Sequence, residues 1–484
     1  MVKTKGLCSH PVFAFFEEIA SIPHGSGNVE QISDYLAGFA VERNLECWQD
    51  AWHNVVMIKE ASPGYEKAEP VILQGHMDMV AVKVPGLEKD LEKEGLSLAV
   101  QGDDLFAEGT SLGGDDGIAL AYALAILDAK DLPHPRLEVI FTVDEETGME
   151  GAQEIDLSML KGRRMLNIDS EEEGIFLAGC AGGARVDWKL PVTRTLQKGS
   201  VCRIRVKGLA GGHSGVEIHQ ERGNANRLLG QVLYGIWQKA AFHILELSGG
   251  LADNAIPREA EAVILCREDQ AEAVMECCRH LEQEIRQEMR SRDPGFVLEC
   301  EAGELQEAYC LAPEDGRKGI GLLFGAYDGV QGWSRELEGL VETSLNLGIL
   351  KTEETCLRFQ FSVRSSLESA KKTLIARLEN MAWMCGAGCT VRGEYPGWTY
   401  SKESPFRDYA VSVYEDLYGV KPQIQAIHAG LECGILQSKL EGLECISLGP
   451  DIRDIHTTEE RMSISSALRV WEYLLELLKR LPKE

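Results

Sequence analysis

The chain has 484 residues, of which 44% are hydrophobic and 7% aromatic, and its formal net charge is −28. This length is enough for two or three domains with sizeable cores. The negative charge argues against nucleic acid or an anionic membrane as a partner, and it suits a protein that gathers divalent cations.

The cysteines and the N-terminus bear on the compartment. The 14 cysteines include no C-x-x-C motif, and the adjacent Cys277 and Cys278 cannot form an ordinary bridge with each other, so we expect reduced thiols. The basic stretch Met1–Gly6 is not followed by an apolar segment, and the longest apolar run, Ile118–Leu127, is about half a membrane span. These features predict a soluble cytoplasmic protein without a signal peptide or a membrane partner.

The first elements lead to a histidine. Helical spacing of apolar residues runs through Val12–Ala20 and again through Ile32–Phe39, and Asn54–Ile58 then reads as a strand. A second short apolar strand, Val71–Leu73, leads into Gly75-His76-Met77-Asp78. A neutral imidazole at a strand end can bind zinc, and a nearby carboxylate can fix its tautomer. When this segment is taken alone, an ordinary strand-end histidine beside a turn aspartate is the commoner explanation.

Acidic residues recur at the next elements. Asp115 and Asp116 precede the apolar helix Ile118–Leu127. Asp144-Glu145-Glu146 follows a strand at Leu137–Val143, and Asp169 follows a strand at Met165–Ile168. A helix cap or a solvated loop could account for any one of them. Their recurrence predicts convergence on divalent cations, and the mixture of histidine and carboxylate favours zinc or manganese over calcium.

A different texture begins after Gly183. Residues 200–395 alternate strands such as Cys202–Val206 with helical stretches such as Gln270–Met289, without further acid clusters of this kind. We interpret this part as an inserted α+β domain, large enough for two similar subdomains although no fixed-period repeat is visible. Within it, His213 lies in a glycine-rich loop and Asn254 precedes a proline-fixed segment.

An alternating strand at Arg358–Arg364 places Arg364 where it could bind a substrate carboxylate, although a solvated strand arginine is the commoner outcome. From Trp398 the helix–strand alternation returns, with strands at Ile424–Ile427 and Cys445–Leu448. His456 lies in the loop after the second of these strands, where it could reach a metal site. Thr457 or Thr458, followed by acids, predicts the start of a helix.

Together these residues resemble a known family. The matching segments are His76-x-Asp78, Gly113–Gly117, Glu145-Glu146, Asp169 and His456, in the order found in the two-metal peptidase family of carboxypeptidase G2 and peptidase T. Finer details resemble one branch, the aminoacyl-histidine dipeptidases, also called Xaa-His dipeptidases or peptidase D. These details are Asn167–Gly174, Gly179–Gly183, His428–Gly434 and Gly449-Pro450. The resemblance covers essentially the whole chain.

The resemblance implies a two-metal site. Asp115 would bridge two divalent ions, with zinc as the expected metal and Mn²⁺ or Co²⁺ as alternatives. His76 and Asp169 would complete one metal site, and Glu146 and His456 the other. The implied activity is hydrolysis of short peptides of the Xaa-His type, by a hydroxide that bridges the two zinc ions.

The resemblance also implies roles beyond metal binding. Glu145 would be the general base, Asp78 would orient His76, and His213 would stabilise the oxyanion.

The substrate would be held by residues on both sides of the insert boundary. Asn254 and Arg364 would hold the backbone and the carboxylate of the substrate, and the loop from Gly430 to Glu432 would lie near it. The family includes homodimers, so the resemblance also allows a homodimer.

The implied fold is α/β, a zinc-peptidase catalytic domain with a central mixed sheet flanked by helices, plus the inserted α+β lid. The expected boundaries place the catalytic domain at residues 1–185 and 398–484 and the lid at residues 186–397. Two departures from the branch, Asp116 for asparagine and Thr457-Thr458 for Ser-Pro, leave substrate preference open. The alternatives are an N-acyl amino acid amidohydrolase and a non-catalytic metal-dependent binding protein.

Overall fold

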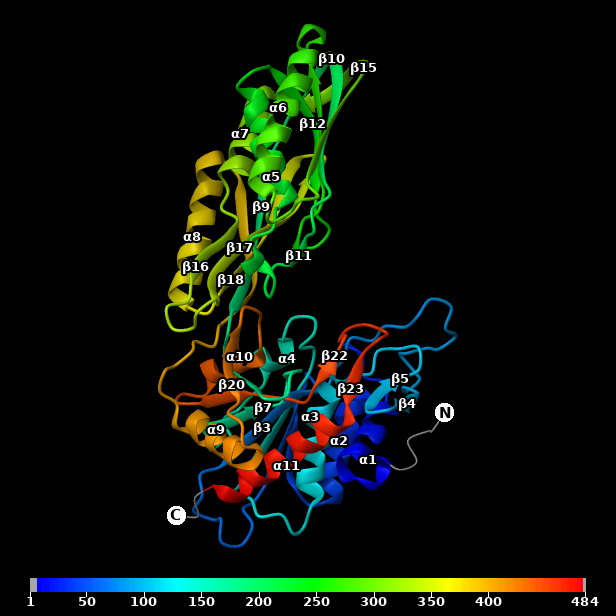
Figure 1. Cartoon of the computed structure of the whole chain (residues 1–484), viewed down its shortest axis with the longest axis vertical. Helices are drawn as coiled ribbons and strands as arrows, with labels where there is room; N and C mark the ends of the chain where they lie inside the picture. The colour runs from blue at the N-terminus through cyan, green and yellow to red at the C-terminus, as the bar shows by residue number, and fades with distance from the viewer. Residues whose placement is uncertain (1–6, 482–484) are drawn as a thin grey trace. The chain divides into compact units, whose positions relative to one another are not determined.

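The computed structural model describes residues 7–481, and the chain divides into two compact units (Figure 1). The first unit is built from Met1–Gly179, Tyr400–Ala426 and Leu431–Glu484, and the second from Cys180–Thr399 and Ile427–Gly430. The basic N-terminal stretch Met1–Gly6 lies outside the described residues.

Two absences concern residues 7–481. No helix in this range is both long and apolar enough to cross a membrane. The 13 cysteines whose side chains the structure describes form no disulfide.

A mixed sheet forms the centre of the first unit, with the strand order β1-β2-β6-β3-β7-β21-β8-β20. Strand β3 (Val71–His76) lies between β6 (Leu137–Thr142) and β7 (Arg164–Asn167) and runs parallel to both. Strand β21 (Glu444–Ser447) continues the parallel run beside β7. The carboxyl ends of these strands therefore meet at one rim, which is where open α/β sheets bind ligands.

The remaining strands of this unit are shorter or lie at the edges. They are β1 (Glu46–Gln49), β2 (Val55–Lys59), β8 (Ile175–Cys180) and β20 (Gln423–Ile427) in the main sheet, and β22 (Ile452–Arg453), β23 (Arg461–Ser463), β5 (Asp104–Ala107) and β4 (Leu98–Gln101) in a small separate sheet.

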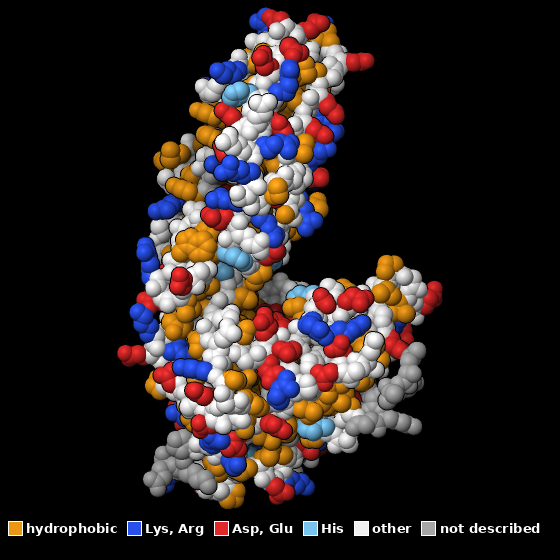
Figure 2. Space-filling view, viewed as in Figure 1, with side chains coloured by type: hydrophobic (Ala, Val, Ile, Leu, Met, Phe, Trp, Pro, Cys, Tyr) orange, Lys and Arg blue, Asp and Glu red, His pale blue; other side chains and the backbone are white. Residues whose placement is uncertain are grey.

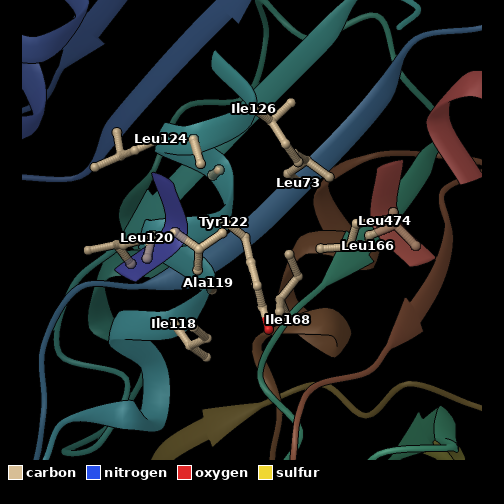
Figure 3. Close-up of a cluster of buried hydrophobic side chains, with 14 of the residues drawn as sticks. Leu73, Ile118, Ala119, Leu120, Tyr122, Leu124, Ile126, Leu166, Ile168 and Leu474 are labelled. Carbon is tan, nitrogen blue, oxygen red and sulfur yellow. The ribbon is translucent and has the colours of Figure 1, made fainter. Parts of the chain in front are cut away.

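Helix α3 (Gly114–Asp128) carries apolar residues on every face from Gly117 to Leu127, and it is buried for that reason. Figure 3 shows its side chains, including Ile118 and Tyr122, packed with Leu73 of β3 and Leu166 of β7. The other α-helices of the unit are α1 (Pro11–Ala20), α2 (Glu30–Glu42), α4 (Glu150–Glu154), α9 (Pro405–Tyr418), α10 (Glu432–Lys439) and α11 (Ile464–Arg480).

The predicted helix start at Thr457 or Thr458 is wrong. Residues 457–459 form turns and bends, β23 follows, and α11 begins only at Ile464. Ser463 is the N-cap of α11, and its side chain accepts a hydrogen bond from Ser466 N. A serine with this geometry is as good a cap as a threonine, so the sequence offered two candidate starts and the later one forms the helix.

The second unit is built on an antiparallel sheet with the order β15-β10-β14-β12-β17-β18-β9-β19, and helices accompany it. Its elements in chain order are β9 (Gly182–Pro191), β10 (Arg194–Lys207), β11 (Gly212–His213), α5 (Ala225–Trp237), β12 (Phe242–Gly249), β13 (Ala255–Ile256), β14 (Ala260–Cys266), α6 (Ala271–Met289), β15 (Val297–Leu311), α7 (Pro313–Gly325), β16 (Gly329–Trp333), β17 (Val341–Thr352), β18 (Cys356–Ser365), α8 (Glu368–Cys385) and β19 (Gly388–Tyr395).

The sheet order reveals a repeat that the sequence did not show. The elements β10-α5-β12-β14-α6-β15 form a βαββαβ unit whose strands are ordered fourth, first, third, second. The elements β9-α7-β17-β18-α8-β19 form a second βαββαβ half with the same strand order in reverse. The half from β10 to β15 is inserted into this second half directly after β9. The two second strands, β12 and β17, pair at Ser248 with Lys351 and at Gly249 with Leu350, which joins the halves edge to edge.

Candidate metal centre

His76 is the last residue of β3, and its side chain is 1% exposed. Its Nδ1 lies 2.9 Å from the backbone oxygen of Asp78, which leaves Nε2 to face the rim of the sheet. There Nε2 lies 3.0 Å from Asp115 Oδ1 and 3.4 Å from Asp169 Oδ1. A ring nitrogen fixed by a carbonyl on one side and directed at carboxylates on the other is oriented for metal ligation.

Asp115 lies between two imidazoles. The N-cap of α3 is Gly113, which makes no side-chain cap bond, so the carboxylate of Asp115 is not used as a helix cap. Its Oδ1 faces His76, and its Oδ2 lies 3.2 Å from His456 Nε2. A carboxylate with one oxygen toward each imidazole has the geometry that a bridging ligand of two cations needs.

Glu146 completes the group around His456. Its Oε1 is buried and lies 2.9 Å from His456 Nε2. The ligand atoms of His76, Asp115 and Glu146 all lie within 4.8 Å of one another.

Asp116 lies closer to this centre than the sequence indicated. Its ligand atom forms a second compact group with those of His76 and Asp169, and its Oδ2 also accepts a hydrogen bond of 3.2 Å from His76 N. Burial raises the pKa of Asp116 well above its ordinary value. Glu171 is a further acid that the sequence did not single out, and burial raises its pKa to about 8.

The protonation of these groups shows how well the donor set fits cations. Burial raises the pKa of Asp169 to about 6. Hydrogen bonds to Asp115 and Glu146 raise the pKa of His456 to about 10. Carboxylates crowded in a buried site must share protons or take up cations to relieve their repulsion. The residues present therefore fit divalent cations, because a cation would relieve the same repulsion between the carboxylates.

Glu145 and Asp78 lie beside this group. Burial raises the pKa of Glu145 well above its ordinary value, and neighbouring acids add to the effect. Asp78 Oδ1 accepts a hydrogen bond of 3.1 Å from Glu145 N, and Oδ2 accepts one of 2.8 Å from Ser26 Oγ. The Asp78 carboxylate is 3.5 Å from His76 Nδ1, farther than its own carbonyl oxygen. Asp78 thus holds the backbone of Glu145 as well as the ring of His76.

Glu432 is fully buried at the start of α10, beneath the rim. Its Oε2 accepts hydrogen bonds from Gln74 Nε2 at 2.6 Å and Thr142 Oγ1 at 2.5 Å. Asn167 Nδ2 donates to Gln74 Oε1 at 2.6 Å, so the bonds cross from β6 through β3 to β7. Burial raises the pKa of Glu432 to about 8. These contacts tie the strand ends together, and a role toward substrate stays a prediction.

The predicted lid residues lie in the second unit. His213 on β11 pairs with Ala255 on β13, so it lies beside Asn254, and Ser214 N donates to Asn254 O at 2.8 Å. Burial and then the charge of Arg364 lower the pKa of His213, which favours its neutral imidazole. Gly430 belongs to the short segment Ile427–Gly430 that is also part of this unit.

Arg364 and His428 extend this group. Arg364 lies on β18, where NH1 donates to Tyr395 Oη at 3.3 Å and Nε is buried without a hydrogen-bond partner among the described residues. His428, which the sequence offered only as part of a matching segment, lies with its Nε2 2.7 Å from Ser344 Oγ. Burial and then Arg364 lower the pKa of His428 to about 3.

Figure 2 shows acidic and basic side chains interspersed over the face in view.

Comparison with known proteins identifies full-length relatives. Residues 204–293 match a family described as a peptidase dimerisation domain. Over 484 residues, 100% of both chains, the sequence is 34% identical to the cytosol non-specific dipeptidase of Escherichia coli (strain K12).

Solved structures agree. The structure is similar to that of aminoacylhistidine dipeptidase from Vibrio alginolyticus, with a TM-score of 0.90 and 35% identity over 98% of this chain and 97% of that one. A tripeptidase from Staphylococcus aureus subsp. aureus mu50, 18% identical, shares the fold with a TM-score of 0.56 over 98% of each chain.

Proposed function

The chain belongs to the M20 family of metallopeptidases, and on this premise we propose that it hydrolyses dipeptides with the help of two divalent cations. The observation that carries the proposal is Asp115, whose two oxygens each face one imidazole. His76 and Asp169 would hold one cation with Asp115, and Glu146 and His456 would hold the other. When bound, such a pair lowers the pKa of water and polarises the scissile carbonyl.

The chain's own residues then move the proton. Glu145 is next to the ligand Glu146 in the chain, and its backbone is held by Asp78. In this position its carboxylate takes the proton of the attacking water and passes it to the leaving amine. The raised pKa of Glu145 makes its carboxylate a stronger proton acceptor, as a general base requires.

The second unit supplies groups suited to a peptide end. Arg364 is half-buried, and its Nε has no hydrogen-bond partner among the described residues, so its guanidinium can bind the C-terminal carboxylate of a substrate. His213 would donate to the oxyanion, and Asn254 would hold the substrate backbone. A requirement for a free carboxylate fits cleavage of dipeptides.

Xaa-His substrates are the proposed preference within this class. The relative from Vibrio alginolyticus is named for aminoacylhistidine substrates, whereas the one from Escherichia coli is named a cytosol non-specific dipeptidase. The second name also supports the proposal that this chain acts in the cytoplasm.

A homodimer is proposed as the assembly, supported by the match to a dimerisation domain. The β12 edge of the matched half is already paired with β17 of the same chain, so a dimer would have to form through another surface. Light scattering coupled to size exclusion measures the mass directly.

A substrate panel tests the function. Zinc-, manganese- and cobalt-reconstituted protein is assayed on dipeptides with and without C-terminal histidine, on tripeptides and on N-acetyl amino acids, each with and without a chelator. We expect chelator-sensitive cleavage of dipeptides, fastest for Xaa-His. Faster cleavage of N-acetyl amino acids would instead identify an amidohydrolase, and two bound zinc ions without any hydrolysis would identify a binding protein.

A further inference from the structure

A carboxylate outside the proposed ligand set makes an unusual set of contacts in the first unit. Glu460 is 2% exposed, and it accepts hydrogen bonds from three consecutive backbone N–H groups. Leu112 N donates to Oε2 at 2.8 Å, Gly113 N donates to Oε2 at 3.2 Å, and Gly114 N donates to Oε1 at 2.8 Å.

These N–H groups need an acceptor from elsewhere in the chain. The first N–H groups of a helix have no partner within the helix, and Gly113, the N-cap of α3, has no side chain to offer. Glu460 therefore caps α3 from a segment more than three hundred residues later in the sequence, as its hydrogen bonds to residues 112–114 record. A charged acceptor at a helix N-terminus is also favoured by the helix dipole.

The space around the contact is tight. A Cβ on Gly114 would lie 3.3 Å from Glu460 Oε1, and Gly113 has a φ of 64°. Two glycines in succession allow the backbone to approach the carboxylate closely in this conformation.

Both ends of this contact are adjacent to proposed metal ligands. Asp115 directly follows Gly114, and His456 precedes Glu460 by one turn of chain. That turn is closed by hydrogen bonds from Glu460 N to Thr457 O at 3.4 Å and from Thr457 Oγ1 to Asp454 O at 2.7 Å. One carboxylate thus ties the loop that carries Asp115 to the loop that carries His456.

We propose that Glu460 is a positioning residue that holds the bridging carboxylate of Asp115 opposite His456 and so sets the affinity of the metal centre. The inference rests on the proposed metal site and deepens it. Glu460 acts through the backbone of residues 112–114, so it needs no contact with cation or substrate. Residues of this kind around metal ligands typically change metal affinity by about 10- to 100-fold.

Glu460→Gln is the informative change. Glutamine keeps the length of the side chain but replaces one acceptor oxygen with an NH₂ group, which cannot accept from a backbone N–H. Glu459→Gln is the matched control: it removes the same charge one residue away, from a side chain that is 72% exposed and lies 3.6 Å from Arg461 NH2.

Two measurements on metal-free protein carry the test. Hydrogen exchange of the amides at residues 112–114 reports whether their hydrogen bonds to Glu460 are formed, and calorimetric titration with zinc reports metal affinity. For Glu460→Gln we expect faster exchange at residues 112–114 and zinc binding weakened by about tenfold or more. In the metal-loaded enzyme, kcat should fall while KM stays within about twofold, because substrate contacts are untouched. Glu459→Gln should match the wild type throughout.

Other outcomes overturn the proposal. Faster exchange with wild-type zinc affinity would make Glu460 a purely structural cap. Unchanged exchange would show that Glu460 does not protect the amides of residues 112–114 in solution. If Glu460→Gln does not fold, Glu460→Asp takes its place, because it keeps the charge but is too short to reach all three donors. A wild type that binds zinc yet cleaves no dipeptide would end the proposed function and leave the zinc comparison standing.

Discussion

The two sheets of this protein place their buried polar groups in opposite ways. In the first unit the parallel strands β3, β6 and β7 bring His76 and the acids that follow their ends to one rim. In the second unit antiparallel strands and loops bury neutral amides that bond to one another. Asn346 Nδ2 donates to Asp253 O and Ala255 O, both at 2.9 Å, and Asn224 Nδ2 lies 3.1 Å from Asn346 Oδ1.

The difference lies in what each arrangement requires from outside. The amides of Asn224 and Asn346 supply both donors and acceptors, so they find their partners within the chain. The rim of the first unit has carboxylates in excess of donors, and the balance must come from protons or cations. These amides therefore have their hydrogen-bond partners within the fold, whereas the carboxylates of the rim need a proton or a cation from outside it.

Removing a group that acts in chemistry should give the largest effect. Glu145→Ala should keep both cations, because Glu145 is not among the proposed ligands, and lower kcat by about 10³-fold or more through loss of proton transfer. Dipeptide hydrolysis and metal content of the purified variant measure the two quantities. The matched control is Glu154→Ala on α4, an exposed site. Near-normal turnover in Glu145→Ala would contradict the assigned role.

Removing the cations should affect one unit and spare the other. Chelation should lower the stability of the first unit by about 4 kcal/mol where the free cation had stood a thousandfold above its dissociation constant. Hydrogen exchange should quicken in peptides that cover β3 and β7. Peptides from β10 and β14 serve as the internal control, and equal changes in both sets would erase the contrast between the units.

Acid should destabilise the second unit through His428. Because its folded-state pKa is lowered from 6.5 to about 3, the unfolded chain binds more protons between these values, and stability falls as pH drops below 6.5. The loss between pH 7 and pH 5 should be about 2 kcal/mol. Urea unfolding of His428→Gln, which can keep the bond to Ser344, should show a smaller loss. An identical loss in both proteins would assign the effect to other groups.

Cation binding should release protons, which is the smallest expected effect. The pKa of His456 is raised to about 10 by Asp115 and Glu146, and that of His76 also lies well above its ordinary value. The ring of His456 is therefore protonated in the metal-free protein at pH 7, and zinc must displace about one proton from it. Calorimetry in two buffers of different ionisation enthalpy measures the number. His456→Ala should release about one fewer, and affinity should rise with pH up to about 10.

The sequence predicted the residues of the rim better than their contacts. The recurrence of His76, Glu146 and Asp169 after apolar strands indicated convergence, because parallel strands end at the same edge of a sheet. Asp115 was found differently, at the start of an apolar helix. The position of Asp116 could not be predicted, because one of two adjacent aspartates at a helix start looks like a cap. Glu460 was hidden for the same reason: next to Glu459 it reads as an exposed acid, and only the fold shows its three donors.

The repeat in the second unit was invisible because topology, rather than sequence period, carries it. Its two βαββαβ halves are nested, so β9 is separated from α7 by an entire half. The false helix start at Thr457 has a local cause, since a better-placed cap at Ser463 lay a few residues further on.

The interrupted first unit has a consequence for synthesis on the ribosome. The inner half of the insert, from β10 to β15, is continuous in sequence and can fold as soon as it emerges. The rim cannot, because His456, Glu460 and the strand β21 follow the insert in the chain. A nascent chain should therefore complete the inner half of the insert before it contains all the residues from which the candidate metal centre is assembled.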